Sequence, residues 1–440
     1  MKAKNNFGLM PFIIITFIYF VVGFFTTVNG QLQGPLQVAF LSDVTVLRNT
    51  LIALIPFSFF LGYLINSPLG GRWIDKHGYK GTLMRAMVCM ILALLGYLAS
   101  SYFITYSGEY GINIGQDYIP YGYFVFLLGS FLMGSSAAIL QVVTNPYVNA
   151  YELPNTQPVQ RMNIVCAINS FATTIAPFFV TGVMFAGVAM ASVTSGQLIM
   201  PFILMTIFII VITVITYCLR LPNIEGTFSK DKCETQRSIW SFSHLKWGVV
   251  AIFFYVGAEV MIGVNVNLHA LELIESGDSP IFFGLENIVL GGVELGIPTL
   301  LATLYWGGLM IGRLCSSFIK NISARTQLVF TAVVAIILTI IAIFSENLWV
   351  LISIGLCHSI MWGAIFSLSV VGLKQYTAQA SGLFMRGVFG GAVFPLLQSF
   401  LADSLDSWQW TWGIVIVCEA VILYYAVRGS RVKKEELINI

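Results

Sequence analysis

Uncharged amides and one tryptophan stand inside long apolar stretches, some of them at helical spacing. Asn29 and Gln33 lie four residues apart, as do Gln141 and Asn145, so each pair shares one face of a helix. Amides donate and accept hydrogen bonds, and aromatic rings cover CH groups, which together suits a solute rich in hydroxyls. Bonding between helices is the alternative role for each amide. Seven residues are the candidate solute ligands: Asn29, Gln33, Gln141, Asn145, Asn163, Asn267 and Trp362.

Glu259 is a carboxylate near the middle of the stretch 246–273. An ionisable group at membrane depth is a functional candidate, because its burial is costly. Burial favours the neutral acid, so Glu259 could take up a proton and couple an ion to transport. Coordination of Na⁺ by the carboxylate is the rival, and a purely structural hydrogen bond is the third interpretation.

Two further charges fall within the last two apolar stretches, Arg386 in 378–403 and Glu419 in 409–428. At a rise of 1.5 Å per residue, both lie roughly 12–14 Å from the same membrane face. Opposite charges at one depth should meet, since an unpaired charge there is costly. We therefore predict a structural ion pair between Arg386 and Glu419. The alternative is that Arg386 faces a cavity and pairs with Glu259.

The remaining pattern predicts an all-α integral membrane protein. The chain is 57% hydrophobic and 10% charged, whereas a soluble protein carries roughly 25% charged residues. A membrane-spanning helix needs about 20 apolar residues. Twelve stretches qualify: 9–38, 48–71, 81–103, 119–149, 158–188, 196–220, 246–273, 296–319, 325–345, 347–372, 378–403 and 409–428. The expected domains are a six-helix bundle at 1–220, a cytoplasmic linker at 221–245, and a second six-helix bundle with a short tail at 246–440.

The basic residues predict the orientation, because loops rich in Lys and Arg stay in the cytoplasm. With both termini cytoplasmic, only Arg48 of the 22 Lys and Arg falls outside and only Arg386 falls within the membrane. Arg313 is placed on the cytoplasmic side. This asymmetry predicts a multi-pass protein in the lipid bilayer, and a net charge of +2 with no basic patch gives no support to nucleic-acid binding.

Motifs of enzymes and metal sites are missing from the sequence. It has no phosphate-binding loop, no nucleophile elbow and no dinucleotide fingerprint. The four histidines are scattered without ligand spacing. We expect no enzymatic activity, no metal site and no cofactor other than a coupling ion, H⁺ or Na⁺.

The loop Gly70-Gly71-Arg72-Trp73-Ile74-Asp75-Lys76-His77-Gly78-Tyr79-Lys80 joins the second and third stretches. It resembles the signature G-x-x-x-D-x-x-G-x-[KR] of the major facilitator superfamily. The resemblance implies that fold, two pseudo-symmetric six-helix halves around a central site. It also implies a conformational role for Arg72, Asp75 and Gly78. The glycines let the loop turn tightly, and Asp75 can approach a helix N-terminus or a basic partner.

Further segments resemble the fucose and glucose/galactose permease branch of that superfamily: Gln141–Tyr147, Arg161–Ser170, Phe253–Glu259, Ser359–Leu368 and Ser381–Pro395. The resemblance implies monosaccharide uptake across the bacterial inner membrane, coupled to H⁺ or Na⁺, by what we expect to be a monomer. Fucose:proton members have Asn-Asp where this chain has Asn29-Gly30, and Glu where it has Gln141. Gln141 fits the glucose/galactose-like members better.

The expected function is uptake of a neutral monosaccharide by alternating access. A membrane sugar sensor is one alternative, although the linker and tail are short for a signalling domain. A facilitator or exporter of another organic solute is the other. An exporter of drugs would need a more apolar cavity, and a transporter of anions would need buried basic residues, of which Arg386 is the candidate.

Overall fold

In the computed structural model of the chain, the structure describes residues 9–45, 47–107, 110–115, 117–151, 153, 158–185, 188, 192–219, 221, 238–290, 293–317, 322–373 and 377–432. Most of the predicted linker at 221–245 therefore lies outside the described residues. Helix α7 already begins within it, at Ser243.

Helices make up most of the described chain. The first half contains α1 (Leu9–Gln31), α2 (Gln33–Phe40), α3 (Arg48–Ser107), α4 (Tyr121–Ala150), α5 (Pro158–Phe179) and α6 (Ile199–Cys218). The second half contains α7 (Ser243–Glu275), α8 (Ile297–Ser317), α9 (Ala324–Ser345), α10 (Leu348–Ser369), α11 (Thr377–Gly387), α12 (Gly390–Leu405) and α13 (Gly413–Tyr424). Single turns extend several of them: η1 (Val180–Met184), η3 (Ser195–Leu198), η4 (Ile239–Ser241), η6 (Gln409–Trp412) and η7 (Tyr425–Gly429).

Two small antiparallel hairpins cap one end of the helices. Strand β1 (Gly111–Ile114) pairs with β2 (Asp117–Pro120), and β3 (Asn287–Leu290) pairs with β4 (Val293–Gly296). We call this the hairpin end. The opposite end, where α6 ends at Cys218 and α7 begins at Ser243, is the linker end.

The long helix α3 is two membrane spans. Gly78 interrupts it with φ of 70° and ψ of 176°, a left-handed conformation that glycine adopts without steric cost. The two spans are Arg48–Ile74 and Lys76–Ser107, so Gly78 falls in the first turn of the second one. The glycine of the loop motif thus allows the chain to reverse between them, as the sequence predicts.

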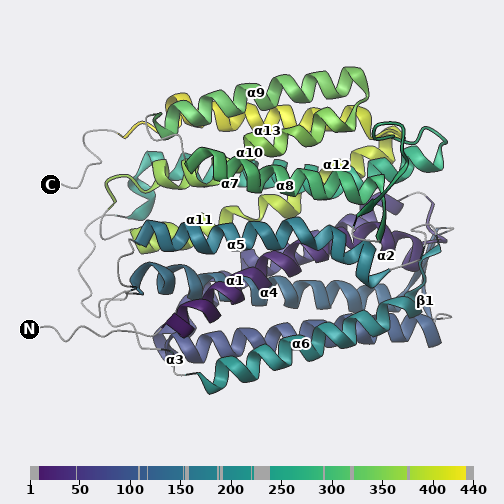
Figure 1. Cartoon of the computed structure of the whole chain (residues 1–440), viewed down its shortest axis with the longest axis horizontal. Helices are drawn as coiled ribbons and strands as arrows, with labels where there is room; N and C mark the ends of the chain where they lie inside the picture. Colours follow the sequence, from purple (N-terminus) through teal and green to yellow (C-terminus); the bar gives the residue numbers. More distant parts are fainter. Residues whose placement is uncertain are drawn as a thin grey trace, which may run out of the picture.

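The described helices confirm the expected all-α membrane architecture. Eleven of them are long and apolar enough to cross a bilayer. Helix α8, with 21 residues, runs beside them and completes the twelve predicted crossings (Figure 1). Its glycines and Arg313 lower its mean hydropathy, so it is not among the eleven.

The helices lie side by side along the long axis of the molecule (Figure 1). The helices α7 to α13 occupy the upper part of the view, and α1, α3, α4 and α6 the lower part. Contacts between the first half (α1 to α6) and the second half (α7 to α13) run from α5 to α8, from α3 to α11 and α12, and from α2 to α7. Small residues bring neighbours close within each group: a Cβ on Gly134 would stand 1.8 Å from the carbonyl oxygen of Phe59.

Candidate functional site

A cavity of about 800 Å³ lies between the two halves of the chain. Helices α1, α3, α4 and α5 line it on one side, and α7, α8, α9 and α10 on the other, together with Val388 in the turn between α11 and α12. Its polar and aromatic lining includes Tyr19, Thr26, Tyr63, Gln141, Asn169, Thr173, Glu259, Trp306, Arg313, Gln327, Ser359, Trp362 and Ser367. Gln327 lies in the first turn of α9, so the cavity extends toward the linker end.

The hairpin end is closed by polar contacts between the halves. Gln31 at the end of α1 donates to the carbonyl oxygen of Gly263 at 2.8 Å, and its own side-chain oxygen accepts from Asn267. The carboxylate of Asp403 on α12 accepts from the backbone N–H groups of Asn49 at 3.2 Å and Thr50 at 2.7 Å. The cavity is thus sealed on the hairpin side by bonds that must break before a solute could enter there.

Two opposite charges face the cavity from the second half. Glu259 on α7 lies within hydrogen-bonding distance, 2.9 Å, of the hydroxyl of Tyr255, one turn earlier. Arg313 on α8 donates through Nε to the carbonyl oxygen of Ser359 at 3.2 Å and through its terminal nitrogen to the hydroxyl of Ser170 on α5. The guanidinium acts electrostatically on Glu259. When Glu259 is ionised, the low dielectric of its surroundings strengthens this attraction, which offsets part of the cost of burying both charges.

The candidate solute ligands divide into two groups in the structure. Gln141 on α4 and Trp362 on α10 line the cavity from opposite halves. The predicted coupling residue Glu259 lines it from the second half. The ring of Trp362 lies against Tyr255 and Phe384 in edge-to-face contacts. The side chain of Asn163, although on α5, lies outside the described residues.

The prediction that Asn29 and Gln33 bind the solute is corrected by the structure. Both side chains form hydrogen bonds with residues of the first half. The amide of Asn29 donates to the hydroxyls of Tyr97 at 2.6 Å and Ser130 at 2.9 Å. Gln33 donates to the carbonyl oxygen of Ile52 at 3.3 Å. These amides join helices inside one bundle, the alternative that membrane helices commonly use.

Asn145 and Asn267 also lie away from the cavity lining that the structure describes. Asn267 belongs to the closed hairpin end, where it donates to Gln31 across the two halves. Asn145 is half-buried one turn beyond Gln141. Equal spacing on a helix places residues on one face, but only the packing decides how far along that face a cavity reaches.

The predicted ion pair between Arg386 and Glu419 is wrong. Glu419 is fully buried and its Oε1 lies 2.8 Å from Nε2 of His358 on α10, while Arg386 is exposed. The equal depth expected for the two residues did not bring their side chains together, because the side chains point in different directions from their helices. His358 is instead the partner of one oxygen, Oε1, of the buried carboxyl group.

Arg313 is a cavity-lining residue that the sequence interpretation missed. The rule that basic residues stay in the cytoplasm assigned it to a loop. Its position in α8 was the available signal: it comes sixteen residues after Ile297, about 24 Å along a helix, which is still inside a bilayer core of about 30 Å. Asn169, which lines the cavity and donates to the carbonyl oxygen of Tyr19 at 2.9 Å, was missed as well.

Of the three loop-motif residues for which a conformational role is expected, Gly78 makes the left-handed turn and Arg72 is exposed. The side chain of Asp75 lies outside the described residues.

Membrane-spanning helices in two groups, with a polar cavity between them that is closed at one end, define a transporter of the secondary type. The profile of the Major Facilitator Superfamily matches residues 15–390. The chain belongs to this superfamily and is a membrane transporter rather than an enzyme.

Individual relatives place it near the sugar permeases. It is 30% identical over 437 residues to the glucose/galactose transporter of Brucella abortus, which covers 98% of this chain and 96% of the relative. It is 22% identical to the L-fucose-proton symporter of Escherichia coli, over 96% of this chain and 94% of the relative. The crystal structure of the E. coli fucose:proton symporter FucP matches with a TM-score of 0.66 and 20% identity, over 96% and 99% of the two chains. The resemblance to this branch of the superfamily is therefore confirmed.

Proposed function

We propose that this chain takes up a neutral hexose across the bacterial inner membrane, by alternating access and coupled to a cation through Glu259. The observation that carries the proposal is the cavity itself. Both halves contribute to its lining, which includes neutral amides, aromatic rings and the carboxyl group of Glu259, and it is closed at the hairpin end.

The lining suits a sugar. Gln141 and Asn169 offer amides that can both donate to and accept from hydroxyls, and Trp306 and Trp362 offer ring surface for the CH groups of a pyranose. The volume of about 800 Å³ falls within the range of about 300–1,000 Å³ typical of small-molecule sites. The relative from Brucella abortus, named a glucose/galactose transporter, supports a hexose as the substrate.

Transport requires the halves to move against each other around this cavity. We assign residues 1–220 and 246–440 to the two moving bundles, with 221–245 as their connection. The bias of Lys and Arg favours a cytoplasmic linker end and two cytoplasmic termini. In that orientation the structure has its outer side closed, and the chain functions as a monomer in the lipid bilayer.

The surroundings of Glu259 favour a proton as the coupled cation. The hydroxyl of Tyr255 lies 2.9 Å from Oε1 of Glu259 and 3.1 Å from the carbonyl oxygen of His358. A hydroxyl has one hydrogen. When Glu259 is ionised, the hydroxyl of Tyr255 lies near two acceptors and can donate fully to only one of them. A protonated Glu259 donates to Tyr255, whose hydrogen then serves His358, and both contacts are satisfied.

The test is uptake by purified protein in proteoliposomes. Radiolabelled D-glucose, D-galactose, D-fructose and L-fucose are each offered with an imposed proton gradient, a sodium gradient, or neither. We expect a hexose to accumulate only with the proton gradient. Accumulation driven by sodium would replace the proton with Na⁺, and failure of every sugar to enter, with or without a gradient, would overturn the function.

Arg313 supports a second candidate, a small organic anion. A guanidinium in the cavity could bind a carboxylate. Its contacts with Ser170 and Ser359, and the nearby charge of Glu259, already satisfy much of that capacity. D-glucuronate added to the same assay distinguishes the two: a sugar site prefers D-glucose, and an anion site prefers the uronate.

A further inference from the structure

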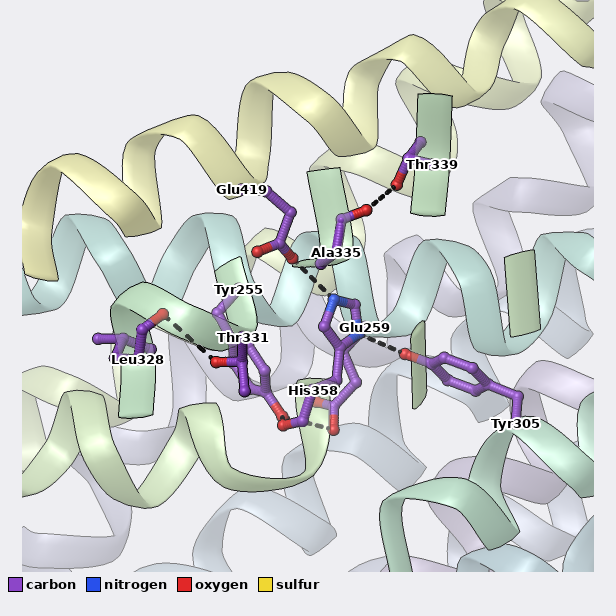
Figure 2. A network of polar contacts seen from close by, with 9 residues as sticks. All are labelled: Tyr255, Glu259, Tyr305, Leu328, Thr331, Ala335, Thr339, His358 and Glu419. Carbon is purple, nitrogen blue, oxygen red and sulfur yellow. Dashed lines mark hydrogen bonds and ion pairs between the residues drawn. The ribbon is translucent and has the colours of Figure 1, made fainter. Parts of the chain in front are cut away.

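Behind Glu259, the second half buries a pair of titratable groups that the proposed transport step does not use. His358 on α10 and Glu419 on α13 have no exposed side-chain surface, and Nε2 of His358 lies 2.8 Å from Oε1 of Glu419. The other ring nitrogen, Nδ1, lies 2.7 Å from the hydroxyl of Tyr305 on α8. Figure 2 shows the imidazole held between Glu419 and Tyr305, with Tyr255 and Glu259 beside it.

We propose that His358 and Glu419 form a second proton-binding site of this transporter, so that α13 takes part in coupling. This inference rests on the proposed function only for its role in transport. The capacity of the pair to bind a proton can be measured without any sugar.

The surroundings of the Glu419 carboxyl group favour its neutral, protonated form. Oε2 of Glu419 is buried without a hydrogen-bond partner among the described residues. A carboxylate there would keep its negative charge with a single hydrogen bond, at a high cost in an apolar interior. A protonated Glu419 donates through Oε1 to Nε2 and leaves only an uncharged carbonyl oxygen without a partner, which costs much less.

The network can hold or release one proton without losing a bond. In the loaded state, Glu419 donates to Nε2, and Nδ1–H donates to the oxygen of Tyr305. In the empty state, the hydroxyl of Tyr305 donates to Nδ1, and Nε2–H donates to the carboxylate of Glu419. The states differ by one proton: the carboxyl proton moves to Nε2, Nδ1–H moves to the oxygen of Tyr305, and the hydrogen that Tyr305 carried before is released from the network. The imidazole therefore carries one hydrogen in both states. Both contacts at 2.7 and 2.8 Å are preserved.

The pair is also tied to the cavity. Tyr255 touches Glu259 and the carbonyl oxygen of His358, so one residue contacts both proposed proton sites. Five titratable groups among the described residues surround the pair or interact with it electrostatically, on α7, α8, α10 and α13: Tyr255, Glu259, Tyr305, Cys357 and Cys418. The charged Arg313 on α8 acts on Glu259 and on the two tyrosines rather than on the pair itself. The facing part of α9 contributes Thr331 and Thr339, whose hydroxyls bond to their own helix (Figure 2).

The first experiment follows transport by Glu419→Gln in proteoliposomes. The glutamine amide can donate to Nε2 as the protonated acid does, but it cannot release a proton. We expect the variant to exchange D-glucose across the membrane at equilibrium, to carry fewer protons per sugar than the parent, and to show a changed pH dependence of uptake. Accumulation with the parent's pH profile and proton stoichiometry would overturn the proposal, because a purely structural bond predicts that result.

Tyr305→Phe is the second variant and covers a failure of Glu419→Gln to fold. It removes one hydroxyl that holds Nδ1, so the pH at half-maximal uptake should shift while exchange continues. Tyr425→Phe is the matched control: its buried hydroxyl bonds to Ser369 at 2.9 Å, away from the pair, and its pH profile should match the parent. Equal profiles for all three proteins would count against the proton site.

The second experiment needs no substrate. Infrared difference spectra are recorded while the pH of the purified protein is changed. Glu259→Gln should remove one titrating carboxyl signal, and adding Glu419→Gln should remove another. If the double variant gives the same spectrum as Glu259→Gln alone, Glu419 does not titrate and the proposal fails. Because this readout is independent of sugar, it separates failure of the pair from failure of the transport function.

Discussion

The guanidinium of Arg313 on α8 donates a hydrogen bond to the hydroxyl of Ser170 on α5 and so joins the two halves of the transporter at the cavity. The same side chain binds the carbonyl oxygen of Ser359 and acts electrostatically on Glu259. One residue thus connects the moving interface to the carboxyl group that we assign to coupling.

Replacing Arg313 should therefore impair transport. Arg313→Gln removes the positive charge near Glu259 and should abolish accumulation, while Arg313→Lys keeps the charge without the planar fork and should retain part of it. Initial rates and accumulation of D-glucose in proteoliposomes measure both. Arg386→Gln is the matched control at an exposed arginine and should behave as the parent. Full accumulation by Arg313→Gln would show that the charge is not needed.

Gln141→Ala should weaken sugar binding. The truncation leaves sugar hydroxyls without their partner, which costs about 1–3 kcal/mol, and each 1.4 kcal/mol is about tenfold in affinity. Isothermal titration of the purified variant measures the change. Gln33→Ala, a buried amide outside the cavity lining, is the control and should keep the parent's affinity if the protein folds. Unchanged binding by Gln141→Ala would remove this residue from the site.

Glu259→Gln should separate sugar movement from its driving force. The amide keeps the contact with Tyr255 but cannot carry a proton, so equilibrium exchange continues and uphill accumulation stops. Exchange and accumulation are compared in the same proteoliposome preparation. Accumulation that persists in Glu259→Gln would place the coupling elsewhere in the chain.

Gln31→Ala should favour opening at the hairpin end. It removes two bonds between the halves, to Gly263 and from Asn267, that exist while this end is closed. Thr27→Cys, at a cavity-lining position, reports the opening in a background without native cysteines. A membrane-impermeant thiol reagent applied from the hairpin side should react faster when Gln31→Ala is added. The control Gln37→Ala, which breaks a bond to Asn49 within the first half, should leave the rate unchanged.

Glu419→Ala should destabilise the fold, unlike Arg386→Gln. Removing the buried carboxyl group deprives His358 of its partner, which costs about 1–3 kcal/mol for the unsatisfied ring nitrogen, and the cavity left behind adds to this loss. Substitution of the exposed arginine should change stability by less than about 0.5 kcal/mol. Thermal unfolding in detergent compares the two. Equal losses for both variants would support the ion pair that the structure contradicts.

The sequence by itself identified the lipid bilayer as the surroundings of the chain and predicted how many times the chain crosses it. Apolar stretches of membrane length predict twelve crossings, because hydrocarbon accepts only backbone whose polar groups bond internally. The turn at Gly78 was also predictable from the sequence, because a glycine in a short loop between two spans indicates a backbone conformation that other residues avoid. Glu259 was found by the same logic: a carboxyl group in the middle of an apolar helix needs a special environment.

Only the tertiary structure decided which polar residues face the cavity. Depth along a helix is readable from the chain, but the rotation of each helix depends on packing against its neighbours. Arg386 and Glu419 share a depth and still do not meet, because Glu419 is turned toward His358. Asn29 and Gln141 are both amides in apolar spans, yet one bonds Tyr97 within its bundle and the other lines the cavity. The contact of Arg313 with Ser170 joins residues 143 positions apart, and it exists because α5 and α8 pack together across the two halves.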